Sequence, residues 1–486
     1  MELLVLAENL FLEYDDRIIL DIDRLEIYST DRIGIVGKNG VGKSTLLKVL
    51  SGELNVSGFR IKRVGSVSYI PQLDETINIS DNDAFAFSRL GVAGIDVNNM
   101  SGGEATRLKI ASVFSQQMHA IFADEPTSHL DQDGIDLLAE HFRAFNGALL
   151  LISHDRDFLD AMVNKIWELR EGKITEYHGS YSQYYKQKAI ERISEEQRFE
   201  KINKEKNRLR QAAAEKHSQA RRMDKKTKVA RKTKEARGRH EKSLGSKQKS
   251  FHSAAKNLER RMSSLGDPDN PEQVKIVKFR QNEALKLSNK HPITGNDIYL
   301  AFGSTVLLKD ASFQVPLGSR VAIIGKNGTG KSSLLRLIMD KDPSLTISPK
   351  VVLGHFEQKR YVLDTEQTVM EFMKSRCDYS VSEIRAVLAS IGLGSSFIHK
   401  SVSALSGGEI TKLQLSAMLM GHYNILLMDE PSNYLDIEGI EALERMMMGY
   451  SGTILFVTHD NRLIENVATM VYKIEDKKLI LQKDEK

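Results

Sequence analysis

Two glycine-rich segments of the sequence each end in lysine and serine, a combination of residue types that can bind phosphate. They are GKNGVGKS at 37–44 and GKNGTGKS at 325–332. Glycine allows backbone N–H groups to turn toward a phosphate, the lysine can reach its oxygens, and the serine hydroxyl can ligate Mg²⁺. The residues expected to hold a nucleoside triphosphate are Gly37, Asn39, Gly40, Gly42, Lys43, Ser44 and Thr45 in the first segment, and Gly325, Asn327, Gly328, Gly330, Lys331, Ser332 and Ser333 in the second.

An Asp-Glu pair follows each glycine-rich segment, at the end of a short apolar run. The pairs are Asp124-Glu125 and Asp429-Glu430. Each aspartate is expected to hold Mg²⁺, and each glutamate to polarise the attacking water as the catalytic base. A lone pair of this kind after a strand more often caps a helix, but the phosphate-binding segment upstream makes that the minor interpretation. The expected metal ligands from these motifs are Ser44, Asp124, Ser332 and Asp429.

A histidine lies 29 residues after each of these glutamates. His154 and His459 each end a strand-like run and are followed by aspartate. A lone histidine is more often structural than catalytic. The equal spacing in the two places favours a catalytic role beside the terminal phosphate for both residues.

The motifs recur at one fixed offset, which indicates an internal duplication. Ser-Gly-Gly-Glu at 101–104 returns at 406–409, and the Asp-Glu pair and the histidine return at the same distance of 305 residues. Three motifs in one register do not arise by chance. The chain therefore contains two copies of one nucleotide-handling module.

Each module must place its phosphate-binding segment between a strand and a helix. Apolar runs at 33–36 and 321–324 precede the glycines, and helix-forming runs at 45–50 and 333–338 follow them. Further strand-like runs lead into the Asp-Glu pairs and the histidines. The expected fold class is α/β, with two tandem P-loop ATPase domains.

These residues resemble the ATP-binding cassette (ABC) family over both halves of the chain. The resemblance matches Ser-Gly-Gly-Glu to the family's signature motif, and Asp131 and Asp436 to the ends of its D-loops. It implies that the modules pack head to tail and bind two ATP between them, each held by one P-loop and the other module's signature. The further nucleotide-binding residues that it implies are Gln72, Ser101, Gly102, Gly103, Gln358, Ser406, Gly407 and Gly408, with Gln72 and Gln358 also as metal ligands.

The resemblance also matches Tyr14 and Phe302 to the aromatic residue on which adenine stacks. An aromatic residue at such a position is often simply part of the core. The two modules differ between the matched glutamine and the signature, since 29 residues separate Gln72 from Ser101 and 48 separate Gln358 from Ser406. Module 1 is therefore expected to have a reduced helical subdomain, without room for the arm that some relatives insert.

Composition limits the class of protein. With 486 residues the chain is long enough for two modules and an inserted element, and its single cysteine, Cys377, excludes a disulfide framework. Apolar runs such as 147–152 and 453–458 fall far below the ~20 residues of a spanning helix, and residues 1–8 indicate a first strand and not a signal peptide. We expect a cytoplasmic protein with no membrane domain.

Positive charge is concentrated between the modules. From 186 to 261 there are 26 Lys and Arg against 10 Asp and Glu, a surplus of 16, although the net charge of the chain is +4. The composition and the helical spacing of apolar residues predict two long helices in an antiparallel hairpin, with the turn within 237–247. A solvated coiled coil is the alternative, but the scarcity of acidic residues favours contact with an RNA backbone.

Two tandem cassettes, a basic helical linker and no membrane segment resemble the ABC-F proteins, which act on ribosomes. The expected domains are 1–180 and 274–486 for the two ABC modules and 181–273 for the linker. The missing arm, the long linker and the strings at 69–75 and 124–131 resemble the antibiotic-resistance branch of that family, closest to the Msr-type macrolide and streptogramin B protection proteins.

The resemblance implies an ATPase that binds the bacterial 70S ribosome near the tRNA exit site, beside 23S rRNA and P-site tRNA. Its linker would reach toward the peptidyl-transferase centre and displace a macrolide-type antibiotic. A housekeeping ABC-F translation factor is the first alternative, although its usual arm is missing here. A transporter ATPase leaves the basic hairpin unexplained, and a non-hydrolysing scaffold is disfavoured because both glutamates are present.

Overall fold

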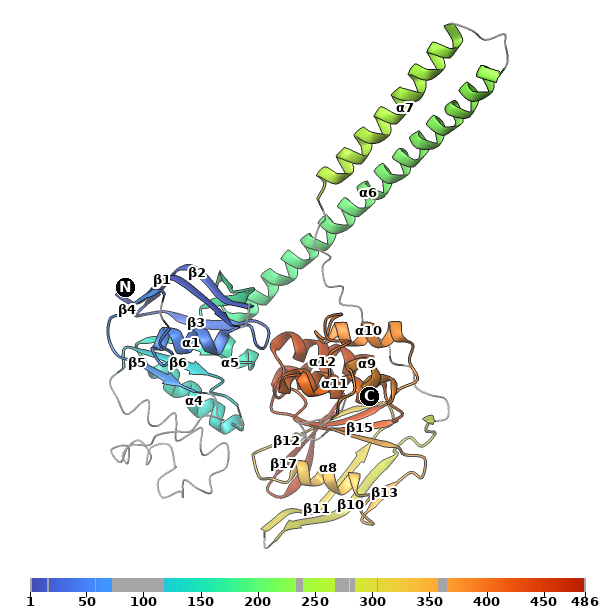
Figure 1. Ribbon diagram of the computed structural model, residues 1–486. Coiled ribbons are helices and arrows are strands. Elements are labelled where there is room, and N and C mark those ends of the chain that lie inside the picture. Colours follow the sequence, from blue (N-terminus) through green and yellow to red (C-terminus); the bar gives the residue numbers. More distant parts are fainter. Residues whose placement is uncertain are drawn as a thin grey trace. The chain divides into compact units, whose positions relative to one another are not determined.

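The computed structural model describes residues 2–14, 17–56, 58–71, 118–128, 130–232, 239–266, 279, 285–303, 305–356 and 365–484. The chain separates into two compact units, Met1–Tyr184 together with Val274–Lys486, and Tyr185–Gln273. Figure 1 shows mixed helices and strands in the first unit and a pair of long helices in the second. The first unit contains both copies of the repeated motifs.

Module 1, which runs from Leu3 to His178, combines two sheets. Its large sheet has the strand order β5-β6-β7-β3-β8-β9, and a smaller antiparallel sheet has the order β2-β1-β4. The strands are β1 (Leu3–Tyr14), β2 (Arg17–Tyr28), β3 (Arg32–Val36), β4 (Arg60–Arg63), β5 (Val67–Ile70), β6 (Ala120–Asp124), β7 (Ala148–Ile152), β8 (Lys165–Arg170) and β9 (Lys173–His178). Its helices are α1 (Lys43–Ser51), α4 (Gln132–Ala144) and α5 (Arg156–Met162) within the described ranges.

Module 2, which runs from Ile293 to Asp484, repeats this arrangement. Its large sheet has the order β14-β15-β16-β12-β17-β18, and its smaller sheet has the order β11-β10-β13. The strands are β10 (Ile293–Phe302), β11 (Thr305–Val315), β12 (Arg320–Gly325), β13 (Leu345–Ile347), β14 (Leu353–Phe356), β15 (Ile425–Asp429), β16 (Thr453–Val457), β17 (Met470–Glu475) and β18 (Lys478–Asp484). Equivalent strands occupy the same places in both large sheets, so the predicted α/β fold and its duplication are confirmed.

The central strands of each large sheet are short, apolar and buried. Every residue of β6, β7 and β16 is buried, as parallel strands covered on both faces require. In module 1, β7 pairs in parallel with both β6 and β3. The P-loop, the Asp-Glu pair and the histidine therefore all lie at the carboxyl ends of adjacent parallel strands, which is where open α/β sheets bind ligands.

Module 2 has helices α8 (Lys331–Met339), α9 (Val369–Lys374), α10 (Val381–Ser390), η4 (Val402–Ala404), α11 (Gly407–Met420), α12 (Ile437–Gly449) and α13 (Asn461–Val467). Those from α9 to α11 form a helical subdomain between β14 and β15. The corresponding residues of module 1, 72–117, lie outside the described residues. The predicted reduction of the subdomain in module 1 concerns these residues and stays a prediction.

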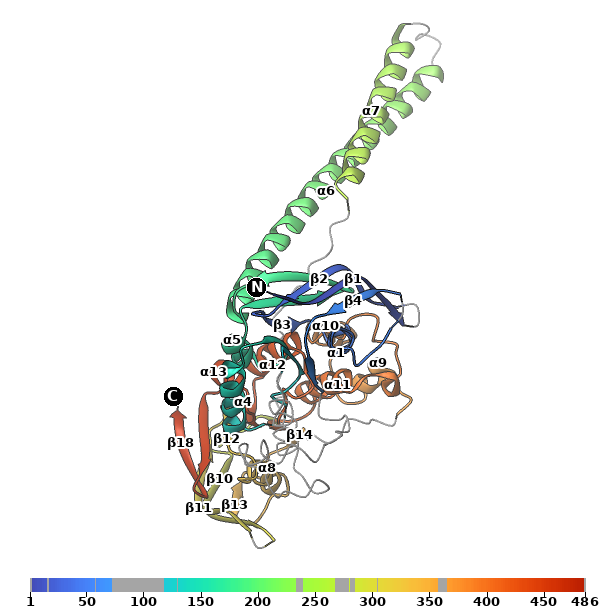
Figure 2. The same ribbon diagram turned by 90° about the vertical axis from the view of Figure 1, so that its left-hand side faces the viewer.

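The second unit is a helical hairpin. Helix α6 (Tyr181–Lys232) and helix α7 (Arg239–Ser264) run side by side in both views (Figure 1 and Figure 2). His217 Nε2 on α6 lies 2.9 Å from Glu259 Oε1 on α7, and Leu209, Ala213 and Ala255 are buried. The predicted antiparallel pair of long helices is confirmed. None of the helices in the described ranges is long and apolar enough to cross a membrane.

The turn of the hairpin was predicted too late in the sequence. Helix α7 already begins at Arg239, so residues 239–247 are helical and not part of a turn. A single glycine such as Gly245 costs a helix only about 1 kcal/mol relative to alanine, and good helix formers surround it. Of the predicted turn, residues 237 and 238 lie outside α7, and both are outside the described residues.

Candidate active site

The P-loop of module 1 forms a tight connection between β3 and α1. Gly42 has a φ of 105°, in the left-handed region, and a Cβ there would lie 2.5 Å from the Ile19 side chain. Lys43 begins α1, and its Nζ donates to the carbonyl oxygens of Gly37 at 2.7 Å and Lys38 at 3.1 Å. Burial lowers the pKa of Lys43. A loop of this form at a helix N-terminus offers N–H groups and an ammonium group to a phosphate.

Module 2 builds the same loop. Gly330 has a φ of 102°, and Lys331 Nζ donates to the carbonyl oxygens of Gly325 at 2.7 Å and Lys326 at 2.9 Å. Burial lowers the pKa of Lys331 as well. Both copies therefore present the same phosphate-binding geometry.

The end of β6 places oxygen ligands beside the first P-loop. Asp124 is 2% exposed and accepts hydrogen bonds from the Tyr69 hydroxyl at 3.3 Å and from the Ser44 hydroxyl. Burial raises the pKa of Asp124. Among the described residues, no group of three or more His, Cys, Asp or Glu could hold a metal ion. Ser44 and Asp124 nevertheless fit Mg²⁺, which takes few protein oxygens and completes its shell with phosphate and water. Asp429 ends β15 at the equivalent place in module 2.

The two glutamates share a strained backbone conformation. Glu125 has a φ of 49° and Glu430 a φ of 48°, values that residues other than glycine rarely adopt. Their backbone N–H groups donate to the carbonyl oxygens of Ile152 at 2.9 Å and Val457 at 3.0 Å. Strain of this kind persists where the surrounding structure holds it, and it is concentrated at functional sites. The neighbouring strand thus fixes the backbone of each glutamate.

The histidine of each module lies against its glutamate. His154 Nε2 is 3.2 Å from Glu125 Oε1, and His459 Nε2 is 3.5 Å from Glu430 Oε1. Burial, with Lys43 adding to it, lowers the pKa of His154 to about 3, and burial lowers the pKa of His459 to about 4. Both imidazole rings are therefore neutral, and neither contact is an ion pair.

The pKa values of the two glutamates are shifted in the opposite direction from those of the histidines. Burial raises the pKa of Glu125 and of Glu430 to about 8, and the preceding aspartate adds to the rise in each case. A carboxylate with a raised pKa is a stronger base near neutral pH. Oε1 of Glu125 is buried and makes no hydrogen bond among the described residues, although His154 Nε2 lies 3.2 Å away. In its ionised form, Glu125 can therefore accept a proton from a water molecule.

A cavity of about 410 Å³ lies at the first P-loop. Its lining residues are Tyr14, Ile19, Asn39, Gly40, Gly42, Lys43, Ser44, Thr45, Asp124, Glu125, Ser128, Ile152 and His154 from module 1, and Gly408, Asn433 and Tyr434 from module 2. Ten residues of module 1 that the sequence predicts for the first site thus line one cavity, together with an eleventh predicted residue, Gly408 of the second signature. The volume is in the range of small-molecule sites. Module 2 completes the site of module 1.

Backbone N–H groups of each P-loop are held by a D-loop aspartate of the other module. Asn39 N donates to Asp436 Oδ2 at 2.9 Å, and Asn327 N donates to Asp131 Oδ2 at 3.3 Å. Each of these aspartates also caps a helix of its own module, α12 or α4. The two modules are therefore joined head to tail by equivalent contacts.

Comparison with known proteins assigns the chain to a family. A model of the ABC transporter family matches residues 20–128 and 308–433. The chain is 33% identical over 460 residues to the erythromycin resistance ATP-binding protein MsrA of Staphylococcus epidermidis, covering 94% of each protein. It is 29% identical to the ribosome protection protein VmlR of Bacillus subtilis, over 96% of this chain and 85% of that one. This chain belongs to the ABC-F family.

A solved structure supports the fold of this ABC-F protein. The archaeal ribosome recycling factor aABCE1, solved in complex with the ribosomal stalk protein aP1, superimposes with a TM-score of 0.63 at 19% identity, over 96% of this chain and 87% of that one. At this level of identity the likeness shows the fold alone. The two ABC modules and the family together establish that this ABC-F protein binds and hydrolyses ATP.

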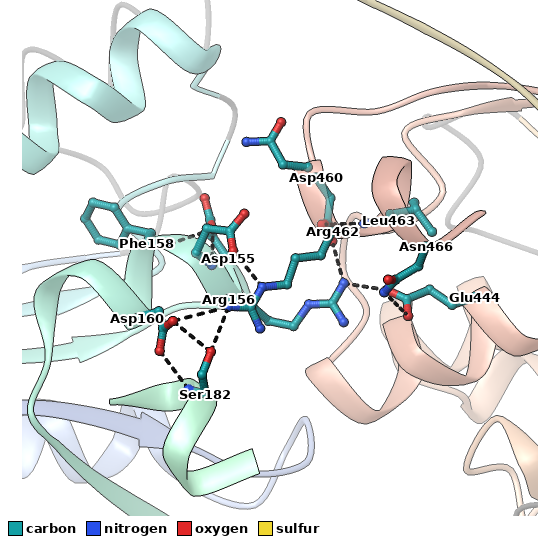
Figure 3. Close-up of polar contacts among 12 residues, drawn as sticks. Asp155, Arg156, Phe158, Asp160, Ser182, Glu444, Asp460, Arg462, Leu463 and Asn466 are labelled. Carbon is teal, nitrogen blue, oxygen red and sulfur yellow. Dashed lines mark hydrogen bonds and ion pairs between the residues drawn. The ribbon is translucent and has the colours of Figure 1, made fainter. Parts of the chain in front are cut away.

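The ABC-F protein has a second set of contacts between its modules that the sequence analysis missed (Figure 3). Arg156 Nη2 on α5 lies 2.5 Å from Glu444 Oε1 on α12 and 3.4 Å from Asp460 Oδ2. Arg156 is 5% exposed. Burial opposes its charge, but the two carboxylates outweigh burial and raise its pKa.

Arg462 on α13 makes the neighbouring contact. Its Nε donates to Asp157 Oδ1 at 2.6 Å. Its Nη2 donates to Ser182 Oγ, in the first turn of α6, at 3.3 Å (Figure 3). Asp160 accepts from the backbone N–H of Ser182 at 2.7 Å. Asp157 and Arg462 are 305 residues apart, so they hold equivalent positions in the two modules. The sequence could have indicated this pair, because opposite charges occupy two positions that are related by the offset of the repeated motifs.

The remaining predicted site residues are placed as follows. Ser406 caps α11 and accepts from the backbone N–H of Glu409, and Gly407 begins that helix. Phe302 ends β10 and is 79% exposed, whereas its counterpart Tyr14 lines the cavity. Five predicted residues lie outside the described residues: Gln72, Ser101, Gly102, Gly103 and Gln358.

Proposed function

We propose that this ABC-F protein binds the bacterial 70S ribosome in its ATP-bound form, near the tRNA exit site, and displaces a macrolide-type antibiotic with its interdomain linker. The observation that carries the proposal is the surplus of 16 positive charges between residues 186 and 261, in a chain with two ATP-hydrolysing modules. RNA is the polyanion that such a surface fits. The proposed contacts are 23S rRNA and P-site tRNA.

The dimensions of the hairpin support this role. Helix α6 has 52 residues, which at about 1.5 Å per residue extend over about 78 Å. Exposed cations along it include Arg221, Arg222 and Lys225, and α7 exposes Lys247 and Lys249. Cations spread along helices contact phosphates and fix position without reading sequence. The linker therefore combines reach with affinity for an RNA backbone.

The relatives support the same proposal. MsrA is named for erythromycin resistance and VmlR for ribosome protection, and the chain matches both over nearly its whole length. A housekeeping translation factor of the same family is the second candidate. The two candidates share ribosome binding and differ in whether the linker protects against a drug.

We also propose roles for the active-site residues. Lys43 and Lys331 bind the phosphates of ATP, and Glu125 and Glu430 accept the proton of the attacking water. Mg²⁺, when bound beside Asp124, would neutralise charge on the phosphates. The buried, strained glutamates next to neutral histidines support these assignments.

The deciding experiment is expression of the gene in a susceptible bacterium, with growth measured against macrolides, lincosamides and pleuromutilins. Resistance to macrolides is the expected result. A variant lacking residues 226–245, reconnected by a short Gly-Ser turn, loses seven helical residues from each of α6 and α7, or about 10 Å of reach. Residues 226–245 hold eight Lys and Arg against two Asp and Glu, which is 6 of the surplus of 16. We therefore expect this variant to hydrolyse ATP and to bind ribosomes less tightly, and to lose protection even at concentrations that saturate the ribosomes.

Two results would separate the candidates. Full protection by the shortened variant would remove the displacement model. Ribosome binding without resistance to any of the three drug classes would favour the housekeeping factor.

A further inference from the structure

A largely buried lysine on the signature helix of module 2 has no part in the site as described so far. Lys412 lies on α11, in the second turn after Gly407, and its side chain is 12% exposed. Its Nζ donates to Asp436 Oδ1 at 2.9 Å, and the Asp436 side chain is 3% exposed. A buried ammonium group is retained only where a partner offsets its desolvation. The partner here is the D-loop aspartate.

Asp436 uses its two oxygens in two modules. Oδ1 accepts from Lys412 Nζ and from the backbone N–H of Gly439, both at 2.9 Å. Oδ2 accepts from the backbone N–H of Asn39, in the P-loop of module 1, at 2.9 Å. Burial opposes ionisation of Asp436, but Lys412 outweighs burial and holds its pKa at about 2. Lys412 therefore favours the ionised form of the carboxylate that holds Asn39.

The backbone around this contact leaves little room for change. A Cβ on Gly439 would lie 3.0 Å from Lys412 Cε, and a Cβ on Gly408 would lie 2.9 Å from the carbonyl oxygen of Tyr434. That carbonyl oxygen in turn accepts from Asn39 Nδ2 at 3.0 Å. Asn39 in the P-loop of module 1 is thus held by the D-loop of module 2, and the signature helix packs against that D-loop.

We propose that Lys412 is a positioning residue for ATP hydrolysis at the first site, the one built on Lys43 and Glu125. Lys412 fixes the Asp436 carboxylate, and Asp436 fixes the P-loop through Asn39. The residue belongs to module 2 but acts on the site of module 1. The second site, built on Lys331 and Glu430, has its own D-loop contact from Asp131 to Asn327. Loss of Lys412 therefore affects one of the two sites.

The test measures each site separately in the full-length protein. Glu430→Gln leaves hydrolysis to the first site, and Glu125→Gln leaves it to the second. With Glu430→Gln, adding Lys412→Gln is expected to lower kcat about ten-fold, as expected when a charge-assisted hydrogen bond is lost. With Glu125→Gln, the same change should leave kcat within about two-fold. Lys412→Arg should restore most of the loss, because it keeps the charge.

Hydrogen–deuterium exchange without nucleotide gives a readout that does not depend on turnover. Lys412→Gln should speed exchange in the P-loop at 37–44 and leave the P-loop at 325–332 unchanged, since Asn39 loses a fixed acceptor. Arg385→Gln is the matched control, because it removes one positive charge from an exposed position on α10 of the same module. This control should change neither site.

Three outcomes would overturn the proposal. An equal fall in kcat at both sites would show that Lys412 only stabilises module 2. Unchanged exchange at 37–44 would show that the contact does not hold the P-loop. Failure of Lys412→Arg to restore activity, with an unaltered melting temperature, would show that the positive charge is not what acts.

Discussion

The ion pair between Arg156 and Glu444 offers a quantitative test of how the modules are held together. Arg156 is 5% exposed, and Glu444→Met leaves its guanidinium group with Asp460 Oδ2 at 3.4 Å as the remaining ion-pair partner among the described residues. Removal of one partner from a buried pair costs about 3–5 kcal/mol. Because Asp460 remains, we expect the lower end, about 3 kcal/mol of unfolding free energy. The double variant Arg156→Met with Glu444→Met should recover part of this loss, since it removes the buried guanidinium group and leaves only Asp460, whose side chain is 18% exposed, without its ion-pair partner.

The assay is thermal and urea unfolding of the three variants beside the unaltered protein. Arg24→Met is the matched control, because Arg24 Nη2 lies at the same 2.5 Å from Glu26 Oε1 but the Arg24 side chain is 61% exposed. An exposed pair contributes little, so this variant should unfold like the unaltered protein. Equal destabilisation by the single and double Met variants would refute the reasoning, since it would show that lost contact area and not an unpaired charge sets the cost.

Three further predictions concern the site, the core and the linker. Glu125→Gln with Glu430→Gln should bind ATP but hardly hydrolyse it and should accumulate on ribosomes, and turnover at the unaltered rate would contradict the catalytic assignment. Burial raises the pKa of Glu441 to about 7, so the folded protein binds more protons than the unfolded chain between about pH 4.5 and 7, and stability falls as pH rises through that range. The free energy of unfolding of Glu441→Gln, measured with urea, should therefore rise relative to that of the unaltered protein by up to about 3 kcal/mol between pH 5 and pH 8. Neutralising Arg221 and Arg222 should flatten the salt dependence of ribosome affinity by up to about one unit per lost phosphate contact, and an unchanged slope would favour the solvated coiled coil.

The parts of the site that the sequence predicted are those built by one local segment. A strand that ends in a glycine-rich turn or in Asp-Glu places its own side chains, so spacing alone located Lys43, Asp124 and Glu125. The conserved register between the two copies extended the same prediction to Lys331 and Glu430. Composition and the helical spacing of apolar residues likewise located the long helices of the hairpin. A long run with few Gly or Pro residues favours a helix.

Contacts between distant segments could not be predicted in the same way. Lys412 and Arg156 each lie in an ordinary helical stretch, and their partners Asp436 and Glu444 are chosen only when the modules pack. The prediction of the hairpin turn was wrong for another reason. The prediction treats Gly245 as a helix breaker, whereas the neighbouring helix formers outweigh the cost of one glycine.

The pair of Asp157 and Arg462 has a consequence for how this two-module chain can have evolved. The two residues occupy the same position in the two copies, and they bind each other at 2.6 Å. If two identical copies associated in this way, each side chain would meet its own twin, either aspartate against aspartate or arginine against arginine. Like charges at such a distance repel. The divergence of this one position thus favours pairing of module 1 with module 2 over pairing of either module with a copy of itself. The two modules of the fused chain are therefore not interchangeable.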